Sequence, residues 1–150
     1  LVVRAESRAM GVEFDVVNTF HDSLQGQERG SNRAILFILD GIRVCHLGDL
    51  GHILTPEQVE QFGKIDILLI PVGGRFTINP QEATQVTAVL NPRIAIPMHY
   101  KTTKCGFPIE GVEAFLVGKD RIKQSPTSEV TINQEDLPKE CTVLVIPPGN

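Results

Sequence analysis

The residues of this sequence best suited to bind a metal are histidines and aspartates that follow apolar, strand-like segments. His21 comes directly after one such segment, and His99 comes after another. Asp49 and His52 lie together in the loop that follows a third segment. Imidazole nitrogens and carboxylate oxygens suit zinc, manganese or iron. If the fold brings these loops together, the pattern predicts a His/Asp metal site.

Each of these side chains also has a purely structural interpretation. Asp49 stands between two glycines, where an aspartate often forms a turn by bonding its own backbone. His21 could belong to an exposed loop, and His99 could be a partly buried histidine that bonds a carbonyl group. His52 could either cap the helix that follows or line the site. His46 falls inside a predicted strand, which favours a core or supporting role.

The elements that would position these loops alternate between strands and helices. Thr55-Pro56-Glu57-Gln58 and Asn79-Pro80-Gln81-Glu82 are capping boxes with proline at the first helical position. Gly63 ends the first helix, and the second extends to about residue 90. Apolar segments typical of strands cover residues 42–46, 65–70 and 93–98. Strand, helix, strand, helix, strand predicts a parallel sheet, whose strand ends meet at one ligand-binding edge.

Further elements flank this unit. Residues 12–16 alternate as a half-buried strand does, and the apolar residues 34–39 predict a strand buried on both faces. Asp40-Gly41 predicts a tight hairpin turn into the strand 42–46. A short helix is expected at residues 109–116. Two late strands are expected at residues 129–133 and 142–146.

Composition excludes several classes of protein. The 150 residues carry 14 basic and 18 acidic side chains, a net charge of −4, whereas nucleic-acid binders present basic patches. No apolar run approaches the roughly 20 residues that cross a bilayer, so no membrane partner is expected. Three widely spaced cysteines without a C-x-x-C pair are typical of reduced thiols and predict a cytoplasmic protein. One α/β domain over residues 1–150 is expected.

Weaker signals concern the ligand. Gly73-Gly74 lacks the spacing of a nucleotide-binding loop, yet an unrelated doubly wound domain that binds a phosphorylated small molecule there is an alternative. Lys101 and Lys104 stand near His99. They could meet an anionic group of a small-molecule substrate, although an ordinary solvated pair is equally compatible with the sequence.

Three blocks of this sequence together resemble the metallo-β-lactamase-fold hydrolases. They are His-Leu-Gly-Asp-Leu-Gly-His at 46–52, Ile-Asp-Ile-Leu-Leu-Ile-Pro-Val-Gly-Gly at 65–74 and Ile-Pro-Met-His-Tyr-Lys-Thr at 96–102. The branch it resembles most is that of zinc-dependent hydrolases related to the ascorbate-6-phosphate lactonases. His21-Asp22 with Gly26, Arg29-Gly30 and Asn32 also fits that branch. The resemblance covers nearly the whole chain.

The resemblance implies an αββα sandwich with two metals between its sheets, zinc being expected and manganese or iron being alternatives. It implies that His21 binds the first metal, that Asp49 bridges both and that His99 binds the second. Asp49 and His52 are then the expected catalytic residues. A hydroxide bound by the metals would attack an ester, lactone, amide or phosphodiester.

The sequence departs from this family in one respect. The family's main ligand block, H-x-H-x-D-H, does not occur in residues 1–150, and in the family it lies upstream of the region that Leu1 begins. The chain is therefore expected to be an N-terminally incomplete, C-terminal portion of the fold, inactive by itself. The alternative is a non-catalytic truncated domain that binds a partner or forms a homo-oligomer through its uncovered sheet.

Overall fold

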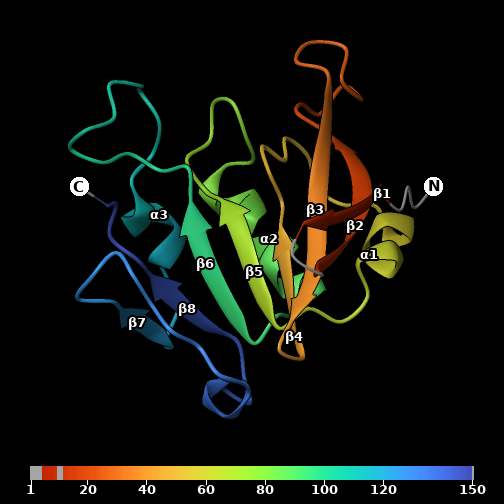
Figure 1. Cartoon of the computed structure of the whole chain (residues 1–150). Helices are drawn as coiled ribbons and strands as arrows, with labels where there is room; N and C mark the ends of the chain where they lie inside the picture. The colour runs from red at the N-terminus through yellow and green to blue at the C-terminus, as the bar shows by residue number, and fades with distance from the viewer. Residues whose placement is uncertain (1–4, 10–11, 150) are drawn as a thin grey trace.

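The computed structural model describes residues 5–9 and 12–149, which form one mixed β-sheet with helices on one face (Figure 1). Neighbouring strands are antiparallel from β1 to β4 and parallel from β4 onward, in the order β4-β5-β6-β8-β7. In sheet order the strands are β1 (Ala5–Ala9), β2 (Val12–Phe20), β3 (Ser31–Leu39), β4 (Ile42–His46), β5 (Ile67–Pro71), β6 (Ile94–Met98), β8 (Thr142–Val145) and β7 (Ile122–Gln124).

The helices begin where the capping signals predict. They are α1 (Pro56–Phe62), α2 (Pro80–Leu90) and α3 (Val112–Leu116). Both predicted capping boxes are present, with Thr55 bonded to Gln58 and Asn79 bonded to Glu82 in both directions. Gly63 ends α1 as predicted. Because α1 and α2 connect parallel strands, the carboxyl ends of β4, β5 and β6 lie at one edge of the sheet.

The main core lies between the helices and one face of the sheet. Leu36, Leu68 and Ile70 of the strands are at most 1% exposed, and so are Phe62 of α1 and Phe115 of α3. Burying a side chain of this size contributes roughly 1.5–3 kcal/mol. This packing fixes the register of the strands whose ends carry the candidate site.

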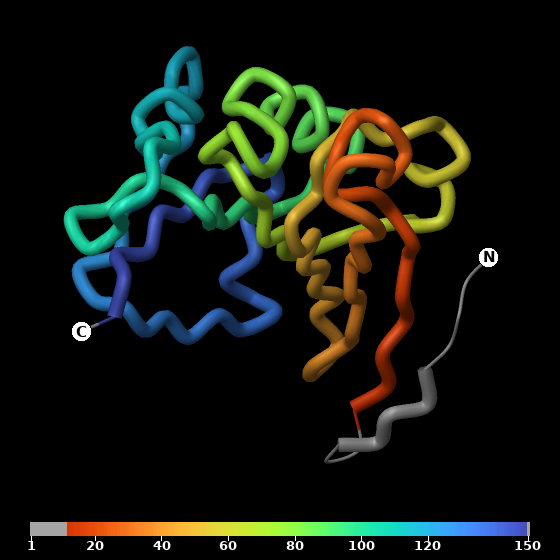
Figure 2. The backbone as a smooth tube through the Cα atoms, turned by 90° about the horizontal axis from the view of Figure 1, so that it is seen from above, coloured from red at the N-terminus to blue at the C-terminus, as the bar shows by residue number. Residues whose placement is uncertain are grey.

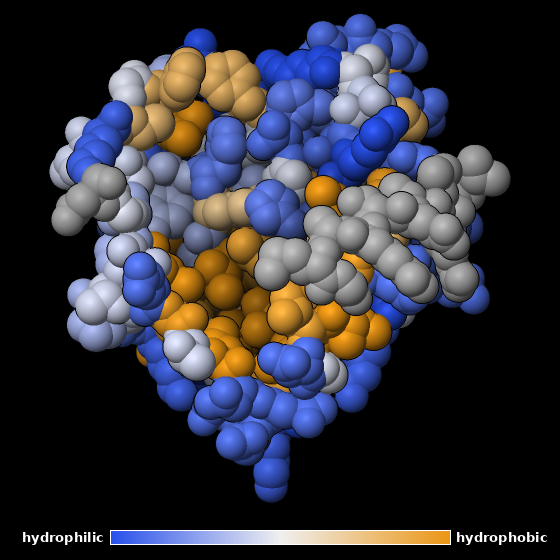
Figure 3. Space-filling view, in the orientation of Figure 1, coloured by the Kyte–Doolittle hydropathy of each residue, from blue (hydrophilic) through white to orange (hydrophobic). Residues whose placement is uncertain are grey.

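The opposite face of the sheet is covered only in part. Figure 2 shows the helices on one side of the sheet and the chain leading into β8 on the other. There Ile132 and Leu137 pack on the sheet residues Ile42, Ile67 and Ile94. Figure 3 shows that a hollowed apolar area remains on this face. The described residues thus supply one sheet and one helical layer of the expected four-layer sandwich.

Three sequence-based predictions of elements need correction. Strand β3 is buried on one face only, because Ile35 and Leu39 of the other face are 40% and 47% exposed. The expected strand at 129–133 is irregular chain before a short 3-10 turn (Gln134–Asp136), although its Ile132 still packs on the apolar face. Strand β7 was not predicted, since its three residues are all exposed and carry no periodic pattern. The expectation that the chain is N-terminally incomplete concerns Leu1, which lies outside the described residues.

The described chain contains three cysteines, one of which is deeply buried. Cys45, Cys105 and Cys141 are free thiols. Burial raises the pKa of the Cys45 thiol to about 12, so this thiol is not reactive at neutral pH. Among the described residues, none of the helices has both the length and the apolar character that a membrane crossing requires.

Candidate metal site

Three side chains from separate loops meet at the carboxyl edge of the parallel strands. His21 follows β2, Asp49 follows β4, and His99 follows β6. His21 Nε2 lies 3.8 Å from Asp49 Oδ2, and His99 Nε2 lies 3.9 Å from Asp49 Oδ1. The carboxylate therefore stands between the two imidazoles, with one oxygen toward each.

These distances are too long for hydrogen bonds and close to those between ligands of a shared metal. Two ligands held tetrahedrally at about 2.1 Å from a zinc lie about 3.4 Å apart. As the side chains stand, no three His, Cys, Asp or Glu residues within the described chain enclose a metal position. A closure of about half an ångström would bring each histidine to zinc-ligand spacing from its Asp49 oxygen.

One ring nitrogen of His21 has an unsatisfied hydrogen-bonding capacity. Its Nε2 atom is buried, and no described residue bonds it. A buried polar nitrogen without a partner is energetically unfavourable, so such atoms in folded proteins usually meet water, an ion or a ligand. This nitrogen lies 3.8 Å from Asp49 Oδ2. An imidazole nitrogen and a carboxylate oxygen together form a donor set that fits a divalent metal.

The loop that carries His21 is organised by the neighbouring Asp22. The Asp22 carboxylate is buried and accepts four backbone N–H groups, those of Leu24, Gly26, Glu28 and Arg29, at 2.8–3.2 Å. Burial alone would raise the pKa of this carboxyl, but the four donors outweigh burial and lower the pKa below its ordinary value. Asp22 is therefore a structural anion that shapes the His21 loop.

Asn32 ties the Asp49 loop to the sheet. Its Oδ1 accepts the N–H of Asp49 at 3.0 Å. Its amide nitrogen donates to Leu47 O at 2.8 Å and to Thr19 Oγ1 at 2.7 Å. The Asn32 side chain thus connects β2 to the loop after β4 and fixes the position of the Asp49 backbone.

Two glycines let the loops of the site pack backbone against backbone. Gly51 donates its N–H to Phe20 O at 2.9 Å, and a Cβ on Gly51 would overlap the backbone of His21 and Asp22. A Cβ on Gly73 would overlap the carbonyl oxygen of His99. Any larger residue at either position must displace a predicted metal ligand.

His99 has a left-handed backbone conformation. Its φ is +54°, which is uncommon for a residue other than glycine and carries a strain of roughly 1–2 kcal/mol. The hydrogen bonds of the flanking chain hold it there: Val72 donates to Met98 O at 3.1 Å, and Lys101 donates to Glu110 O at 2.8 Å. Strained residues of this kind are concentrated at functional sites.

The remaining two histidines bond the backbone. His52 Nε2 accepts the N–H of Phe20 at 3.1 Å, and its Nδ1 lies 2.8 Å from Ile53 O, which assigns the proton to Nδ1. Both ring nitrogens of His52 are thereby engaged, which favours a positioning role over the catalytic role predicted for it. His46 Nδ1 accepts the N–H of Gly48 at 3.0 Å, in agreement with the predicted supporting role.

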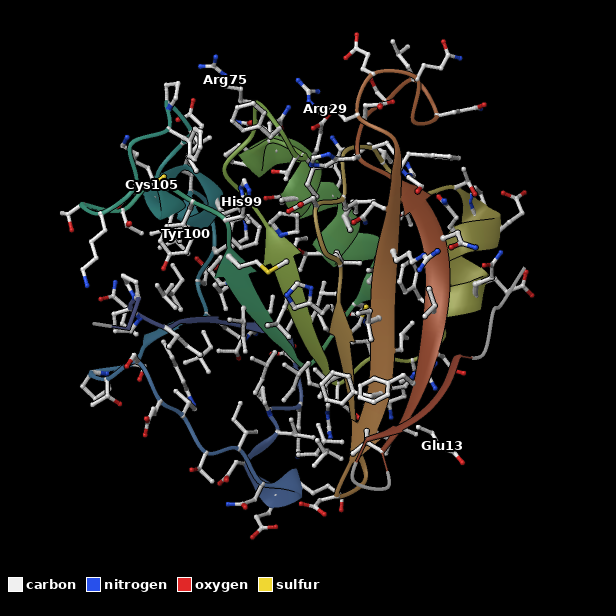
Figure 4. All side chains as sticks on the ribbon, turned by 45° about the horizontal axis from the view of Figure 1, so that its top comes forward. Glu13, Arg29, Arg75, His99, Tyr100 and Cys105 are labelled. Atoms are coloured by element: carbon white, nitrogen blue, oxygen red, sulfur yellow. The ribbon has the colours of Figure 1, made fainter. Side chains whose placement is uncertain are left out.

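The two lysines for which an anionic substrate group was one of two alternatives each donate to a backbone carbonyl. Lys101 Nζ donates to Phe107 O at 2.7 Å, and Lys104 Nζ donates to Gly149 O at 3.3 Å. Arg29 and Arg75 are further exposed cations on this edge, which the sequence did not single out for this role. Figure 4 shows them reaching from two different loops on the edge that carries His99.

Comparison with known proteins shows the family of this chain. The profile of the beta-lactamase superfamily domain matches residues 3–99, which include His21, Asp49 and His99. The chain belongs to the metallo-β-lactamase superfamily. The alternative of an unrelated doubly wound domain is wrong, because the sheet is mixed and its helices cover one face only.

The relatives within this superfamily are metal-dependent hydrolases by name. A UPF0173 metal-dependent hydrolase of Thermococcus onnurineus is 38% identical over 94 residues, which are 61% of this chain and 42% of that protein. One of Caldivirga maquilingensis is 30% identical over 143 residues, 93% of this chain and 52% of that protein. The chain thus spans about half the length of these curated relatives.

A solved structure extends the likeness to three dimensions. A Thermotoga maritima protein, described as a candidate zinc-dependent hydrolase of the metallo-β-lactamase superfamily, superposes with a TM-score of 0.79 at 44% identity. The match covers 91% of this chain and 66% of that one. The predicted metallo-β-lactamase-like α/β fold is therefore confirmed.

Proposed function

We propose that this chain contributes His21, Asp49 and His99 to the metal site of a zinc-dependent hydrolase that acts on an ester, lactone or phosphodiester. The observation that carries the proposal is the buried, unpartnered Nε2 of His21, which faces a carboxylate that also faces His99. The names of the similar proteins, metal-dependent hydrolases and a candidate zinc-dependent one, support the choice of reaction and metal.

When bound, zinc supplies a Lewis acid and lowers the pKa of a bound water toward 7. The chain's own residues orient this chemistry. His21 and His99 present Nε2 to opposite oxygens of Asp49, and Asn32 holds the backbone of Asp49. The Asp49 side chain is 54% exposed, so a substrate can approach it from solvent.

The proposed site needs further ligands. A structural zinc takes four protein ligands, and a catalytic zinc usually takes three with water in the fourth position, so His21, Asp49 and His99 cannot complete two sites. We infer that the missing ligands belong to the part of the relatives that this chain does not span. The isolated 150 residues are accordingly expected to show no robust turnover.

The test measures zinc content and hydrolysis in the whole protein with His21→Ala, Asp49→Asn and His99→Ala. Each should lower zinc content, and Asp49→Asn should reduce hydrolysis of a lactone or aryl ester by at least about tenfold, because it removes an anionic ligand. Asp120→Asn, a matched change at an exposed aspartate away from the site, should change neither. Unchanged zinc content in all three variants would overturn the proposal.

A second function is favoured by the open face of the sheet. Ile35 and Leu39 of β3 lie on this face and are 40% and 47% exposed, and contiguous apolar surface of this kind is typical of interaction sites. On this alternative the chain is a non-catalytic domain that self-associates or binds a partner. Whole protein that binds no metal but elutes as a defined oligomer, and dissociates on Leu39→Lys, would favour it.

A further inference from the structure

The rim of the candidate site carries two arginines on one aromatic ring. The guanidinium carbon of Arg75 lies 5.4 Å from the centroid of the Phe76 ring, and that of Arg29 lies 5.7 Å from the same centroid. The Phe107 ring meets Phe76 edge to face, at 5.8 Å between centroids and 85° between planes. These four residues, the rim cluster, come from three loops: 21–30, 72–79 and 99–111.

Both guanidinium groups contact the same ring, and neither has a strong counter-charge. Glu28 Oε2 lies 3.8 Å from Arg29 Nη1, and both side chains are substantially exposed, which makes this a weak pair. No described carboxylate forms an ion pair with Arg75. The acids of these three loops are Asp22, Glu28 and Glu110, and Asp22 is engaged by four backbone N–H groups. Asp49 of the neighbouring loop faces the histidines instead. The two arginines on this ring therefore retain N–H groups that can donate hydrogen bonds to an added anion.

The rim cluster is fixed relative to the candidate metal site by backbone contacts. The N–H of Arg29 donates to Asp22 Oδ2 at 2.8 Å, and Asp22 adjoins His21. Gly73, which packs on the backbone of His99, accepts the N–H of Glu110 at 2.8 Å. The loops that carry the arginines are thus the loops that carry or brace the predicted metal ligands.

One ring of the aromatic pair at this edge is exposed, and the other is half-buried. Phe107 is 62% exposed, and Phe76 is half-buried beneath the arginines. Lys101 Nζ bonds the carbonyl of Phe107 and so fixes the loop that presents its ring. Exposed aromatic rings beside guanidinium groups offer an apolar surface next to anion-binding donors, a combination typical of small-molecule sites.

We propose that the rim cluster is a subsite that binds an oxyanion, a carboxylate or a phosphate, carried by the substrate at some distance from the bond that is cleaved. Arg29 and Arg75 donate to the anion, and the two rings contact the adjoining apolar part of the ligand. The assignment of the anion to a substrate rests on the proposed function, whereas binding of the anion itself requires no metal.

The first experiment measures anion binding to the whole protein freed of metal with EDTA. Inorganic phosphate and acetate are titrated separately by calorimetry. At least one should bind saturably, and Arg29→Ala/Arg75→Ala should weaken that binding at least about tenfold, since charge-assisted hydrogen bonds are lost. Arg75→Lys should weaken it less, because it keeps the charge but not the planar fork. Binding of one anion alone would support the subsite and identify its chemistry.

The matched control is Arg121→Ala, which removes an exposed guanidinium that pairs with Glu140 away from this edge. It should leave anion binding unchanged. The subsite is wrong if neither anion binds saturably, if the double variant binds as the wild type does, or if Arg121→Ala weakens binding equally.

The second experiment separates this inference from the proposed function. Zinc-loaded whole protein is assayed with two aryl esters that differ only in a distal carboxylate. The double variant should raise KM for the charged ester at least about tenfold, with kcat and the neutral ester unaffected. Hydrolysis of both esters with no change of KM would overturn the subsite alone. Hydrolysis of neither, with anion binding intact, would overturn the hydrolase alone.

Discussion

The two histidines on either side of Asp49 are held in place by different physical means. His21 belongs to a loop that is organised by a charge, the buried carboxylate of Asp22 with its four backbone donors. His99 is a strained, left-handed residue that is held by backbone hydrogen bonds and by direct packing on Gly73. Added volume should disturb both sides, at Gly51 and at Gly73, but only the His21 side should also respond to pH and to loss of a buried carboxylate.

The largest effect is expected from Gly73→Ala. The new Cβ would overlap the carbonyl oxygen of His99, and backbone cannot yield as a flexible side chain can. The free energy of unfolding should fall by about 3 kcal/mol, the upper end for overpacking, and zinc content should fall with it. Chemical denaturation and elemental analysis measure the two quantities.

Gly106→Ala is the matched control for that change. No atom lies within 4 Å of a Cβ at Gly106, on the same loop as Phe107, so its stability and zinc content should stay as in the wild type. Equal destabilisation by both substitutions would show that loop flexibility, rather than contact with His99, is what Gly73 provides.

The next effect is expected from Asp22→Asn. The amide supplies one oxygen acceptor and no charge for four backbone donors, so the Tm should fall by roughly 5 °C. Zinc binding at His21 should weaken because the loop loses its shape. Thermal denaturation at neutral pH measures the change, and an unaltered Tm would contradict the organising role of this carboxylate.

The same carboxylate sets a pH dependence. The pKa of Asp22 is lower in the folded chain than its ordinary value, so its stabilisation is present above the unfolded pKa of about 3.9 and is lost as pH falls through the folded pKa. The difference in stability between wild type and Asp22→Asn should therefore shrink below about pH 4. A difference that stays constant on acidification would contradict this account.

A smaller effect is expected from Asn32→Leu, which removes all three hydrogen bonds of the Asp49 tether. Stability should fall by about 1–2 kcal/mol. Zinc affinity should fall about 10- to 100-fold, as is typical of residues that orient metal ligands. Asn18→Leu, an exposed asparagine on β2, serves as the control and should leave zinc affinity unchanged.

The smallest effect concerns the backbone of His99. His99→Gly and His99→Ala both remove the imidazole, but glycine accepts a φ of +54° without strain. The glycine variant should be more stable than the alanine variant by about 1 kcal/mol. Chemical denaturation of the two variants measures the difference. Greater stability of the alanine variant would contradict backbone strain at His99.

Local signals in the sequence predicted the unit that builds the site. The capping boxes at Thr55 and Asn79 located α1 and α2 because capping chemistry involves neighbouring residues. The order of strands and helices then placed Asp49 and His99 at one edge, where the structure brings them together with His21. Their binding of a metal stays a prediction.

The supporting contacts could not be predicted because they join residues far apart in the chain. Asn32 bonds a loop 17 positions away, and no local pattern marks such a bond. Arg29 and Arg75 meet only through Phe76. The strand expected at 129–133 failed because apolar side chains such as Ile132 can pack on a sheet face without joining the sheet.

The central claim is that His21, Asp49 and His99 bind one metal centre. The most direct measurement is anomalous diffraction at the zinc edge from crystals of the whole protein grown with zinc. We expect a peak about 2.0–2.2 Å from an Asp49 oxygen and from Nε2 of His21 or His99, with both histidines ligated within the centre. Zinc bound elsewhere, with all three side chains unligated, would contradict it.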